Sequence, residues 1–344
     1  MIETWKQFLT QQGAHIEQDT VVDFGNPSAE RETATRGTVL ADLSQLGVLA
    51  FVGDDAATFL QNQLTNDVRG LHPDTAQLNG FCSPKGRLLG NFLMWRDGPD
   101  FCLQLSGDIK DAVLKRLNMF ILRSKVKSRD ASDETVRLVV AGPQAESAVQ
   151  TATGLMPDDA MKAAHNAQAM VVRLAADKFV LSLAPEIAPD VWNALKASAR
   201  PVGAPTWDWL RLNHGIPMIV AATVDEFVPQ MVNFDLINSV SFQKGCYPGQ
   251  EIVARTHYLG KLKRRMYLTH LEGDRAPAPG DNLYTPDMGD QTSGMVVNAA
   301  PAPAGGFDVL AVAQIESVNN GQPLHWKTAD GPVLTIKPLP YSLS

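Results

Sequence analysis

The fold is decided by the stretch Leu46–Leu64, LGVLAFVGDDAATFLQNQL. Within it, Val48–Val52 is apolar and prone to form a strand, and apolar residues then recur at helical spacing after a turn that begins at Gly53. Glycine permits a tight turn and aspartate caps helices, so the pattern predicts a strand, a turn and a helix. A similar layout returns at Leu138–Gln150, LVVAGPQAESAVQ, with Gly142 in the place of Gly53. The repetition indicates two related α+β halves.

The segments around these two stretches predict further strands and helices. Ala76–Ser106 holds apolar runs separated by Pro-Lys-Gly and Asp-Gly-Pro turns, which is typical of a three-stranded meander. Ala169–Ala184 predicts a hairpin, with a helix to follow near Val191–Ala199. Three more helices are expected: before Gly13, through Thr206–Gly215, and after Gly107 with an apolar face made of Val113, Leu114, Leu117, Phe120 and Ile121.

The character of the sequence changes after about Tyr258. Short strand-forming runs then alternate with Gly, Pro and Asn turns up to the C-terminus, a pattern typical of a small separate β-barrel. We therefore expect a paired α+β region over residues 1–258, whose two interleaved domains divide near residues 45 and 130, and a C-terminal β-barrel over residues 259–344.

The composition is that of a folded, acidic protein. Charged residues make up 19% of the 344 residues and aromatic residues 7%, and the net charge of -7 opposes bulk attraction to nucleic acid or anionic membranes. The cysteines Cys82, Cys102 and Cys246 are far apart, so neither a disulfide framework nor a locally spaced metal site is expected. We find no signal-peptide pattern and no apolar run of about 20 residues. We therefore expect a cytoplasmic protein without a membrane partner, with an organelle matrix after import as the alternative.

The segment Ser241–His257, SFQKGCYPGQEIVARTH, is the strongest candidate for chemistry. Cys246 lies between Gly245 and Gly249, and a helix is expected to begin just after it. The positive end of that helix and the neighbouring Lys244 would favour the thiolate form, which predicts a reactive or ligating sulfur. The alternative is that Cys246 packs in the core like a small apolar residue, as we expect of the other two cysteines.

Two basic clusters and a pair of tryptophans are further candidates. The clusters are Arg123, Lys125, Lys127 and Arg129, and Lys261, Lys263, Arg264 and Arg265. Either could receive RNA or the polyglutamate tail of a folate, but a merely solvated surface is the favoured explanation. Trp207 and Trp209 flank Asp208 on a predicted helix, so at most one of them can line a pocket and stack on a flat heterocycle.

Six motifs together resemble one family. They are LGVLAFVGDDAATFLQNQLTNDV, CSPKGRLLGNF, LRSKV, FVPQMVNFD, KGCYPGQE and KPLPYSLS. From about Leu40 to its end the chain resembles the YgfZ-type folate-binding proteins, relatives of the glycine-cleavage T-protein that are implicated in iron–sulfur cluster maturation and tRNA modification. The resemblance implies an α+β fold in which two related α+β domains and a C-terminal β-barrel form a cloverleaf around a central folate pocket.

The resemblance also implies roles for individual residues. Cys246 and Lys244 become the functional pair. The implied folate contacts are Trp207, Leu46, Asn213, Gln230, Asn233, Tyr247, Glu251 and Arg255. Where the T-protein has its catalytic aspartate this sequence has Gly90 and Asn91, and Asn213 stands where the T-protein has an acidic residue for the pterin. A classical aminomethyltransferase is therefore not expected.

Three functions follow as alternatives. The first is an accessory protein that binds tetrahydrofolate and uses Cys246 to assemble or repair iron–sulfur clusters in client enzymes, including tRNA-modifying ones. A transient cluster on Cys246 would need other ligands from a client or carrier protein, because such clusters take about four ligands. The second is a folate-dependent one-carbon transferase, which needs a positioned acid or base. The third is a tRNA-binding module that uses the basic clusters.

Overall fold

The computed structural model describes residues 1–343, so Ser344, the last residue of the predicted barrel domain, lies outside the described part. The chain divides into two compact units. Unit 1 comprises Met1–Phe59, Arg69–Gln77 and Leu93–Trp207, and unit 2 comprises Leu60–Val68, Leu78–Phe92 and the chain from Asp208 onward. The domain boundaries predicted near residues 45, 130 and 258 stay predictions, because this division follows contacts and not the structural repeats.

Unit 1 contains a six-stranded sheet with the strand order β10-β11-β12-β9-β3-β13. Neighbouring strands are antiparallel, except that β13 runs parallel to β3. The strands are Ala163–His165 (β10), Ala169–Ala175 (β11), Lys178–Leu183 (β12), Val136–Ala141 (β9), Val39–Asp42 (β3) and Arg200–Val202 (β13). β11 and β12 confirm the predicted hairpin.

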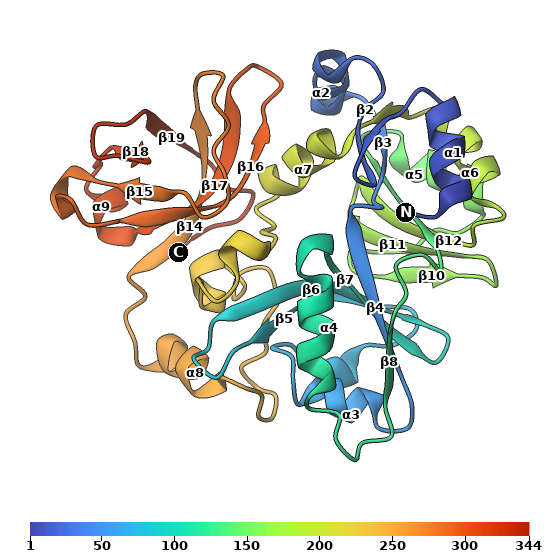
Figure 1. Cartoon of the computed structure of the whole chain (residues 1–344), viewed down its shortest axis with the longest axis horizontal. Helices are drawn as coiled ribbons and strands as arrows, with labels where there is room; N and C mark the ends of the chain where they lie inside the picture. Colours follow the sequence, from blue (N-terminus) through green and yellow to red (C-terminus); the bar gives the residue numbers. More distant parts are fainter. Residues whose placement is uncertain (344) are drawn as a thin grey trace. The chain divides into compact units, whose positions relative to one another are not determined.

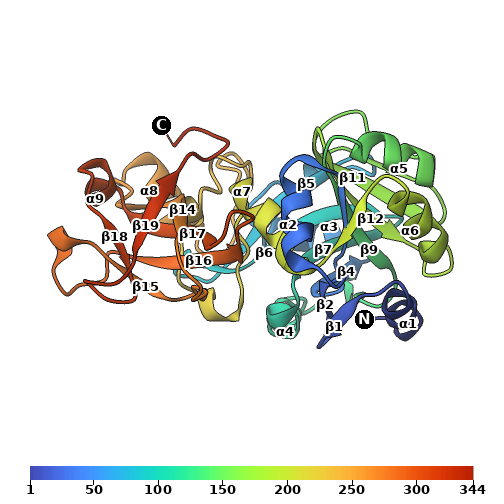
Figure 2. The same ribbon diagram turned by 90° about the horizontal axis from the view of Figure 1, so that it is seen from above.

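Three helices pack on this sheet: Glu3–Gln11 (α1), Ala145–Thr153 (α5) and Ala188–Lys196 (α6). Figures 1 and 2 show α5 and α6 next to each other on one face of the sheet. Their apolar side chains join those of the strands in one buried cluster, which includes Trp5, Val149, Trp192, Val140 and Phe179. Burial of these apolar faces explains why the helices form where the sequence predicted helical spacing.

A short hairpin and a helix complete the N-terminal part of unit 1. The hairpin consists of His15–Glu17 (β1) and Thr20–Asp23 (β2), and the helix is Pro27–Arg36 (α2). The Glu30 carboxylate in α2 is buried and accepts hydrogen bonds from the backbone N–H groups of Phe24, at 2.7 Å, and Gly203, at 2.9 Å. This buried acceptor fastens the helix to the chain around it.

A second sheet has five strands in the order β5-β6-β7-β4-β8. The strands are Ala76–Cys82 (β5), Leu88–Asp97 (β6), Asp100–Ser106 (β7), Leu46–Val52 (β4) and Lys127–Asp130 (β8). β5, β6 and β7 confirm the predicted meander. Two helices belong to the same stretch of chain, Ala56–Gln61 (α3) and Lys110–Asn118 (α4). The expected apolar face continued to Phe120 and Ile121, but α4 ends at Asn118 and the Phe120 side chain is exposed, so that part of the prediction is wrong.

The two strand-turn-helix units share the geometry of their turns. Gly53 follows β4 with φ +128°, and Gly142 follows β9 with φ +125°. In each turn the glycine carbonyl accepts a hydrogen bond of 3.0 Å from the first residue of the helix, Ala56 or Ala145. A side chain would collide with backbone in both, because a Cβ atom would lie 2.1 Å from one carbonyl oxygen at Gly53 and 2.2 Å from another at Gly142. The predicted relation between the two halves is therefore present in the backbone.

Unit 2 contains a closed six-stranded barrel in the order β14-β17-β16-β15-β18-β19. The strands, orange to red in Figure 1, are Arg264–Leu271 (β14), Asn282–Tyr284 (β15), Gly294–Pro301 (β16), Phe307–Gln314 (β17), Leu324–Trp326 (β18) and Val333–Lys337 (β19), with Ile315–Asn319 (α9) after β17. Buried residues such as Leu271, Val296 and Trp326 form its core. The barrel that the alternating turns predicted is confirmed.

Two further helices carry residues of the predicted site, Ala204–Asn213 (α7) and Gln250–Tyr258 (α8). Both coincide with helices that the sequence predicted. Among residues 1–343, no helix is long and apolar enough to cross a membrane.

Candidate functional site

Cys246 lies in an exposed loop three residues before Gly249, the N-cap residue of α8. The other two cysteines are buried in strands, as predicted, and burial raises the pKa of both the Cys82 and the Cys102 thiol. A buried thiol with a raised pKa stays protonated and unreactive at neutral pH. Exposure of Cys246 excludes the alternative in which this cysteine packs in the core.

Lys244 anchors the loop that carries Cys246. Its side chain is only 5% exposed, and its ammonium donates hydrogen bonds to the backbone carbonyls of Gln61 at 2.6 Å, Asn66 at 2.9 Å and Leu64. A buried ammonium needs such acceptors, because its charge has left water. These hydrogen bonds make Lys244 an anchor that fixes the loop to the rest of unit 2. Its predicted pairing with the thiol of Cys246 stays a prediction.

Tyr247 fixes the loop on the other side of Cys246. Its ring is buried, with its centroid 5.2 Å from the Lys244 ammonium, which is a cation–π distance. Burial, and next the neighbouring Cys82, raise the pKa of the Tyr247 hydroxyl. The loop therefore places an exposed cysteine between residues whose side chains point into the protein.

Gly249 sets the direction in which α8 leaves this loop. It has φ +78°, a conformation that favours glycine, and a Cβ atom here would lie 2.4 Å from the backbone oxygen of Ser83 and 2.6 Å from the backbone of Gly86. The next residue, Gln250, donates its side-chain N–H to the carbonyl of Lys244 at 3.4 Å. Close backbone contact thus joins the KGCYPGQE motif to the turn of the CSPKGR motif.

Gln230 connects α8 to the FVPQMVNFD segment. Its side-chain N–H donates to the carbonyl of Val253 in α8 at 2.7 Å, and the side chain is buried with 2% exposed. Its other polar atom, Oε1, has no hydrogen-bond partner among residues 1–343. Glu251 and Arg255, the other two predicted folate contacts on α8, are exposed.

Asn233 is fully engaged in a structural cluster. Its Nδ2 donates to the carbonyl of Met266 at 3.0 Å and to the hydroxyl of Tyr341 at 3.2 Å, and its Oδ1 accepts from Arg265 at 3.2 Å. Arg265 also forms a two-pronged ion pair with Asp235, at 3.1 and 3.0 Å. Every polar atom of the Asn233 side chain therefore has a partner within unit 2, although a folate role was predicted for it.

Asn213 contacts a buried acid that sequence reasoning missed. The carboxylate of Asp308, on β17, accepts hydrogen bonds from Asn213 at 3.1 Å, Trp209 at 2.8 Å, Lys337 at 2.7 Å and His270 at 2.9 Å. Burial raises the pKa of this carboxyl, but the four donors outweigh burial, and the pKa lies below its usual range. Asp308 is thus occupied as a structural anchor. It lies 95 positions after Asn213 in the sequence, so their contact left no local signal.

Asn91, which the sequence resemblance assigned to the region of the T-protein's catalytic aspartate, also has a structural role. Its Nδ2 donates to the carbonyl of Pro217 at 3.0 Å, and its Oδ1 accepts from the backbone N–H of Ile219 at 2.7 Å. The side chain holds the segment that follows α7 and has no acidic group to offer.

The remaining predicted contacts, Leu46 and Trp207, belong to unit 1. Both side chains are buried, Leu46 at the start of β4 and Trp207 in α7. Within unit 2, Lys244 and Tyr247 lie on the loop before α8, and Gln230 bonds to Val253 in α8. The functional roles predicted for all of these residues stay predictions.

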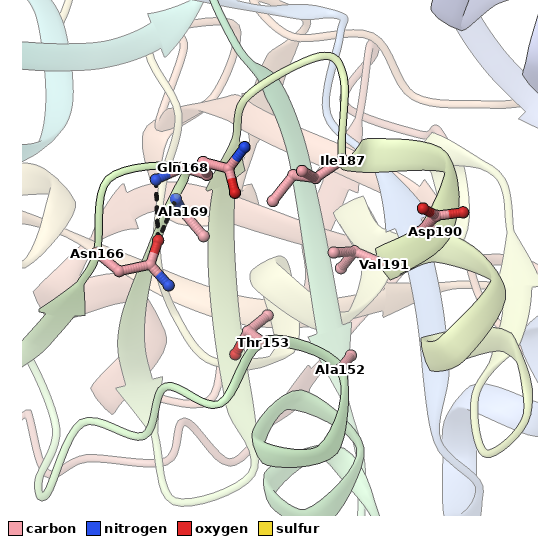
Figure 3. A pocket seen from close by; sticks show the side chains of 8 residues that line it. All are labelled: Ala152, Thr153, Asn166, Gln168, Ala169, Ile187, Asp190 and Val191. Atoms are coloured by element: carbon pink, nitrogen blue, oxygen red, sulfur yellow. Dashed lines mark hydrogen bonds between the residues drawn. The ribbon is translucent and has the colours of Figure 1, made fainter.

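No group of three or more His, Cys, Asp or Glu side chains within residues 1–343 lies close enough to hold a metal ion. A cavity of about 310 Å³ in unit 1 lies beside α5 and α6 (Figure 3). Asn166 lines it and uses its Oδ1 to accept from the backbone N–H groups of Gln168 and Ala169, both at 2.9 Å. None of the residues predicted for the site lines this cavity.

Comparison with known proteins gives concordant matches. The family model described as the GCVT N-terminal domain matches residues 15–244, so its match ends two residues before Cys246. The tRNA-modifying protein YgfZ of Sodalis glossinidius (strain morsitans) is 31% identical over 310 residues, which cover 88% of this chain and 93% of that protein. The tRNA-modifying protein YgfZ of Serratia proteamaculans (strain 568) is 29% identical over 309 residues, covering 89% and 93%.

A solved structure matches almost the whole chain. The glycine cleavage system aminomethyltransferase T from Bartonella henselae superposes with a TM-score of 0.81 at 16% identity, covering 99% of this chain and 97% of that chain. At this identity the match establishes a shared fold, with the α+β architecture and C-terminal barrel that the sequence predicted.

Proposed function

The chain belongs to the family of YgfZ proteins and itself matches the GCVT N-terminal domain, and on this basis we propose that it is a folate-binding accessory protein for tRNA-modifying enzymes. In this role Cys246 takes part in assembling or repairing the iron–sulfur clusters of those client enzymes. The name of the relatives, tRNA-modifying protein, supports the link to tRNA. The observation that carries the proposal is the exposed thiol of Cys246 on a loop with buried anchors.

The loop suits a sulfur that must meet another molecule. Exposure gives a partner access to Cys246, and the buried side chains of Lys244 and Tyr247 fix the backbone on both sides of it. A fixed loop lowers the entropy that is lost when the sulfur binds iron or another thiol. Since a cluster takes about four ligands, the client or carrier protein would supply the others, and the cluster is the cargo that passes between them.

The residues present are compatible with a folate. Gln230 keeps a buried acceptor oxygen without a partner, and Arg211 keeps a buried donor, Nε, without a partner among residues 1–343. A pterin carries both N–H donors and acceptor atoms, so it could satisfy groups of this kind, which are costly to leave unpaired. Gln230 would orient the pterin, and the exposed Arg255 would attract a negatively charged glutamate tail. For Trp207, which belongs to unit 1, the predicted stacking on a folate is proposed on its own. A bound reduced folate would supply a carrier for one-carbon units.

The decisive test of the cysteine is functional replacement in cells that lack the gene. Cys246→Ala should fail to restore the modified nucleosides made by iron–sulfur enzymes in tRNA, while its melting temperature stays that of the wild type. Gln243→Ala changes an exposed side chain of the same loop and should restore modification fully. Full restoration by a stable Cys246→Ala protein would overturn the proposal.

Folate binding is tested separately by titrating the purified protein with tetrahydrofolate and following tryptophan fluorescence. The wild type should bind, and Trp207→Phe and Gln230→Leu should bind at least about tenfold more weakly, a loss of about 1.4 kcal/mol. Glu316→Ala, an acidic residue of the barrel helix α9, serves as the control and should bind like the wild type. Absence of binding by the wild type would remove folate from the proposal.

The alternative of a one-carbon transferase rests on the fold shared with aminomethyltransferase T. It has less support, because Asn91 and Asn213 are engaged in structural hydrogen bonds where an acid would be needed. Turnover of methylene-tetrahydrofolate by the purified protein would favour this alternative over the accessory role.

A further inference from the structure

The loop between α4 and β8 exposes three apolar side chains. Leu122 is 87% exposed, Met119 59% and Phe120 41%, in a part of unit 1 that the mechanism proposed above does not use. Figure 1 shows this loop at the end of α4, where the chain turns back into β8. Exposed apolar groups that gather in one place are typical of interaction sites.

The same segment of the chain is rich in basic residues. The segment Lys110–Arg129 contains seven basic residues and one acidic residue, in a chain whose net charge is -7. Three of the seven form ion pairs with carboxylates, namely Lys110, Lys125 and Arg129. The other four, Lys115, Arg116, Arg123 and Lys127, have no acidic partner within ion-pair distance in the part of the chain that the structure describes. We call Met119, Phe120, Leu122 and these four cations the α4–β8 patch.

The backbone of the loop is held in a costly conformation. Leu122 has φ +45°, in the left-handed region that residues other than glycine rarely adopt. The turn closes with a hydrogen bond of 2.8 Å from the N–H of Ser124 to the carbonyl of Ile121. Such strain persists only where the surrounding structure enforces it, and it is enriched at functional sites.

Two residues of the first strand-turn-helix unit hold the chain at Lys125, three residues after Leu122. Asp55 accepts a hydrogen bond of 2.7 Å from the backbone N–H of Lys125. Gly53 lets the carbonyl oxygen of Lys125 approach so closely that a Cβ atom would lie 2.1 Å from it. The apolar tip is therefore presented by a fixed turn with a strained residue at its apex.

We propose that the α4–β8 patch is the docking surface for the client enzyme, an iron–sulfur protein that presents an apolar pocket rimmed by Asp and Glu. The inference rests on the proposed function and names the surface that receives its partner. Met, Phe and Arg are enriched at protein interfaces, and the unpaired cations are complementary to an acidic rim. The fixed backbone suits a preformed pocket, because a pre-organised loop loses little entropy on binding.

The observations favour a protein over the other two polyanionic partners. RNA could pair with the cations and stack on Phe120, but it would leave the exposed Met119 and Leu122 without a role, because bases stack on aromatic or guanidinium groups. An anionic membrane would accept apolar side chains on a backbone of any conformation, so it would not account for the enforced turn at Leu122.

The test measures binding of the full-length protein to a purified iron–sulfur tRNA-modifying enzyme by biolayer interferometry. The variant Met119→Gln/Leu122→Asn removes two apolar groups, and asparagine tolerates the left-handed conformation that Leu122 adopts. It should bind at least tenfold more weakly than the wild type, as should Arg123→Glu/Lys127→Glu. The control Val333→Thr/Ile336→Thr alters two other exposed apolar residues, on β19, and should bind like the wild type. Melting temperatures of all variants should stay within a few degrees of the wild type.

Three results would overturn the inference. The first is that the wild type does not bind the enzyme. The second is that both patch variants bind the enzyme as tightly as the wild type does. The third is that the patch variants keep their affinity for the enzyme but lose binding to phosphatidylglycerol vesicles or to tRNA. Failure of the proposed function gives a different pattern. Cys246→Ala should bind the enzyme with wild-type affinity yet fail to support modification, so its full activity would contradict the role of the thiol and leave the docking result intact.

Discussion

The loop at Cys246 and the loop at Leu122 each expose a side chain. In both loops, contacts with the rest of the protein hold the backbone in place, but the anchoring residues differ. The Cys246 loop depends on a buried charge, the ammonium of Lys244, which satisfies carbonyl groups of Gln61, Leu64 and Asn66. The Leu122 loop depends on the absence of a side chain at Gly53 and on the carboxylate of Asp55.

The difference predicts how strongly each loop is coupled to folding. Removing a buried charged partner leaves several polar groups unsatisfied inside the protein, whereas removing a surface hydrogen bond lets water replace it. The Cys246 loop should therefore be part of the core of unit 2, whereas loss of the Asp55 hydrogen bond should loosen the Leu122 loop without unfolding unit 1. Four substitutions test this contrast.

Lys244→Met should have the largest effect. The substitution removes the hydrogen-bond donor of three backbone carbonyl groups, those of Gln61, Leu64 and Asn66, and water does not readily replace it because the site is buried. We therefore expect a loss of about 4 kcal/mol in the free energy of unfolding. Denaturant unfolding followed by circular dichroism measures it. The exposed Lys261→Met is the control and should change stability by less than about 0.5 kcal/mol. A loss below about 1 kcal/mol for Lys244→Met would show that the loop is not anchored through this ammonium.

Gly53→Ala should have the next largest effect. The new Cβ atom would meet the carbonyl oxygen of Lys125 at 2.1 Å, and φ +128° is unfavourable for alanine, so we expect a loss of about 3 kcal/mol. Gly98→Ala is the matched control, because Gly98 also has positive φ, +53°, but has open space around it. The control should lose about 1 kcal/mol, the cost of the left-handed conformation alone. Equal losses for the two variants would refute the importance of the close approach.

The positive φ of Gly53 and Gly142 also shows why the fold could be predicted from the sequence. A tight turn between a strand and a helix needs a residue without a side chain, and that local requirement is visible at both Gly53 and Gly142. The barrel was visible for a similar reason, because its short strands are separated by turn residues. The end of α4 was not, because helical spacing of Phe120 and Ile121 does not reveal whether a buried surface exists for them to pack against.

Features of the site could be predicted from the sequence only where they depend on neighbouring residues in the chain. The KGCYPGQE motif indicated an exposed cysteine ahead of a helix, and the structure has both. The partners of Lys244 lie about 180 residues earlier in the chain, and Asp308 lies 95 residues beyond Asn213, so no spacing rule could reveal them. The strained backbone at Leu122 was hidden for another reason, since leucine carries no sequence signal for a left-handed conformation.

Asp55→Ala should have a smaller effect than either change above. It removes the acceptor of the Lys125 backbone N–H, which water can replace, and we expect a loss of about 1 kcal/mol in the free energy of unfolding. Amide hydrogen exchange at residues 121–126 should become faster, because the turn loses its clamp. Asp54→Ala removes only an exposed ion pair with Lys125 and should leave both measurements unchanged. Unaltered exchange in Asp55→Ala would mean that the turn is held by other contacts.

The smallest effect on stability should come from Cys246→Ala, which removes an exposed sulfur. We expect a change within about 0.5 kcal/mol, together with complete loss of support for tRNA modification. Cys102→Ala should behave in the opposite way, because this buried thiol fills space in β7: we expect a loss of about 1 kcal/mol with function retained.

The most direct measurement is therefore the level of iron–sulfur-dependent tRNA modification in cells that carry either cysteine variant, with the unfolding free energy of each purified protein beside it. The account predicts that Cys246→Ala is stable and inactive, whereas Cys102→Ala is destabilised and active. Modification at the wild-type level with Cys246→Ala would contradict it.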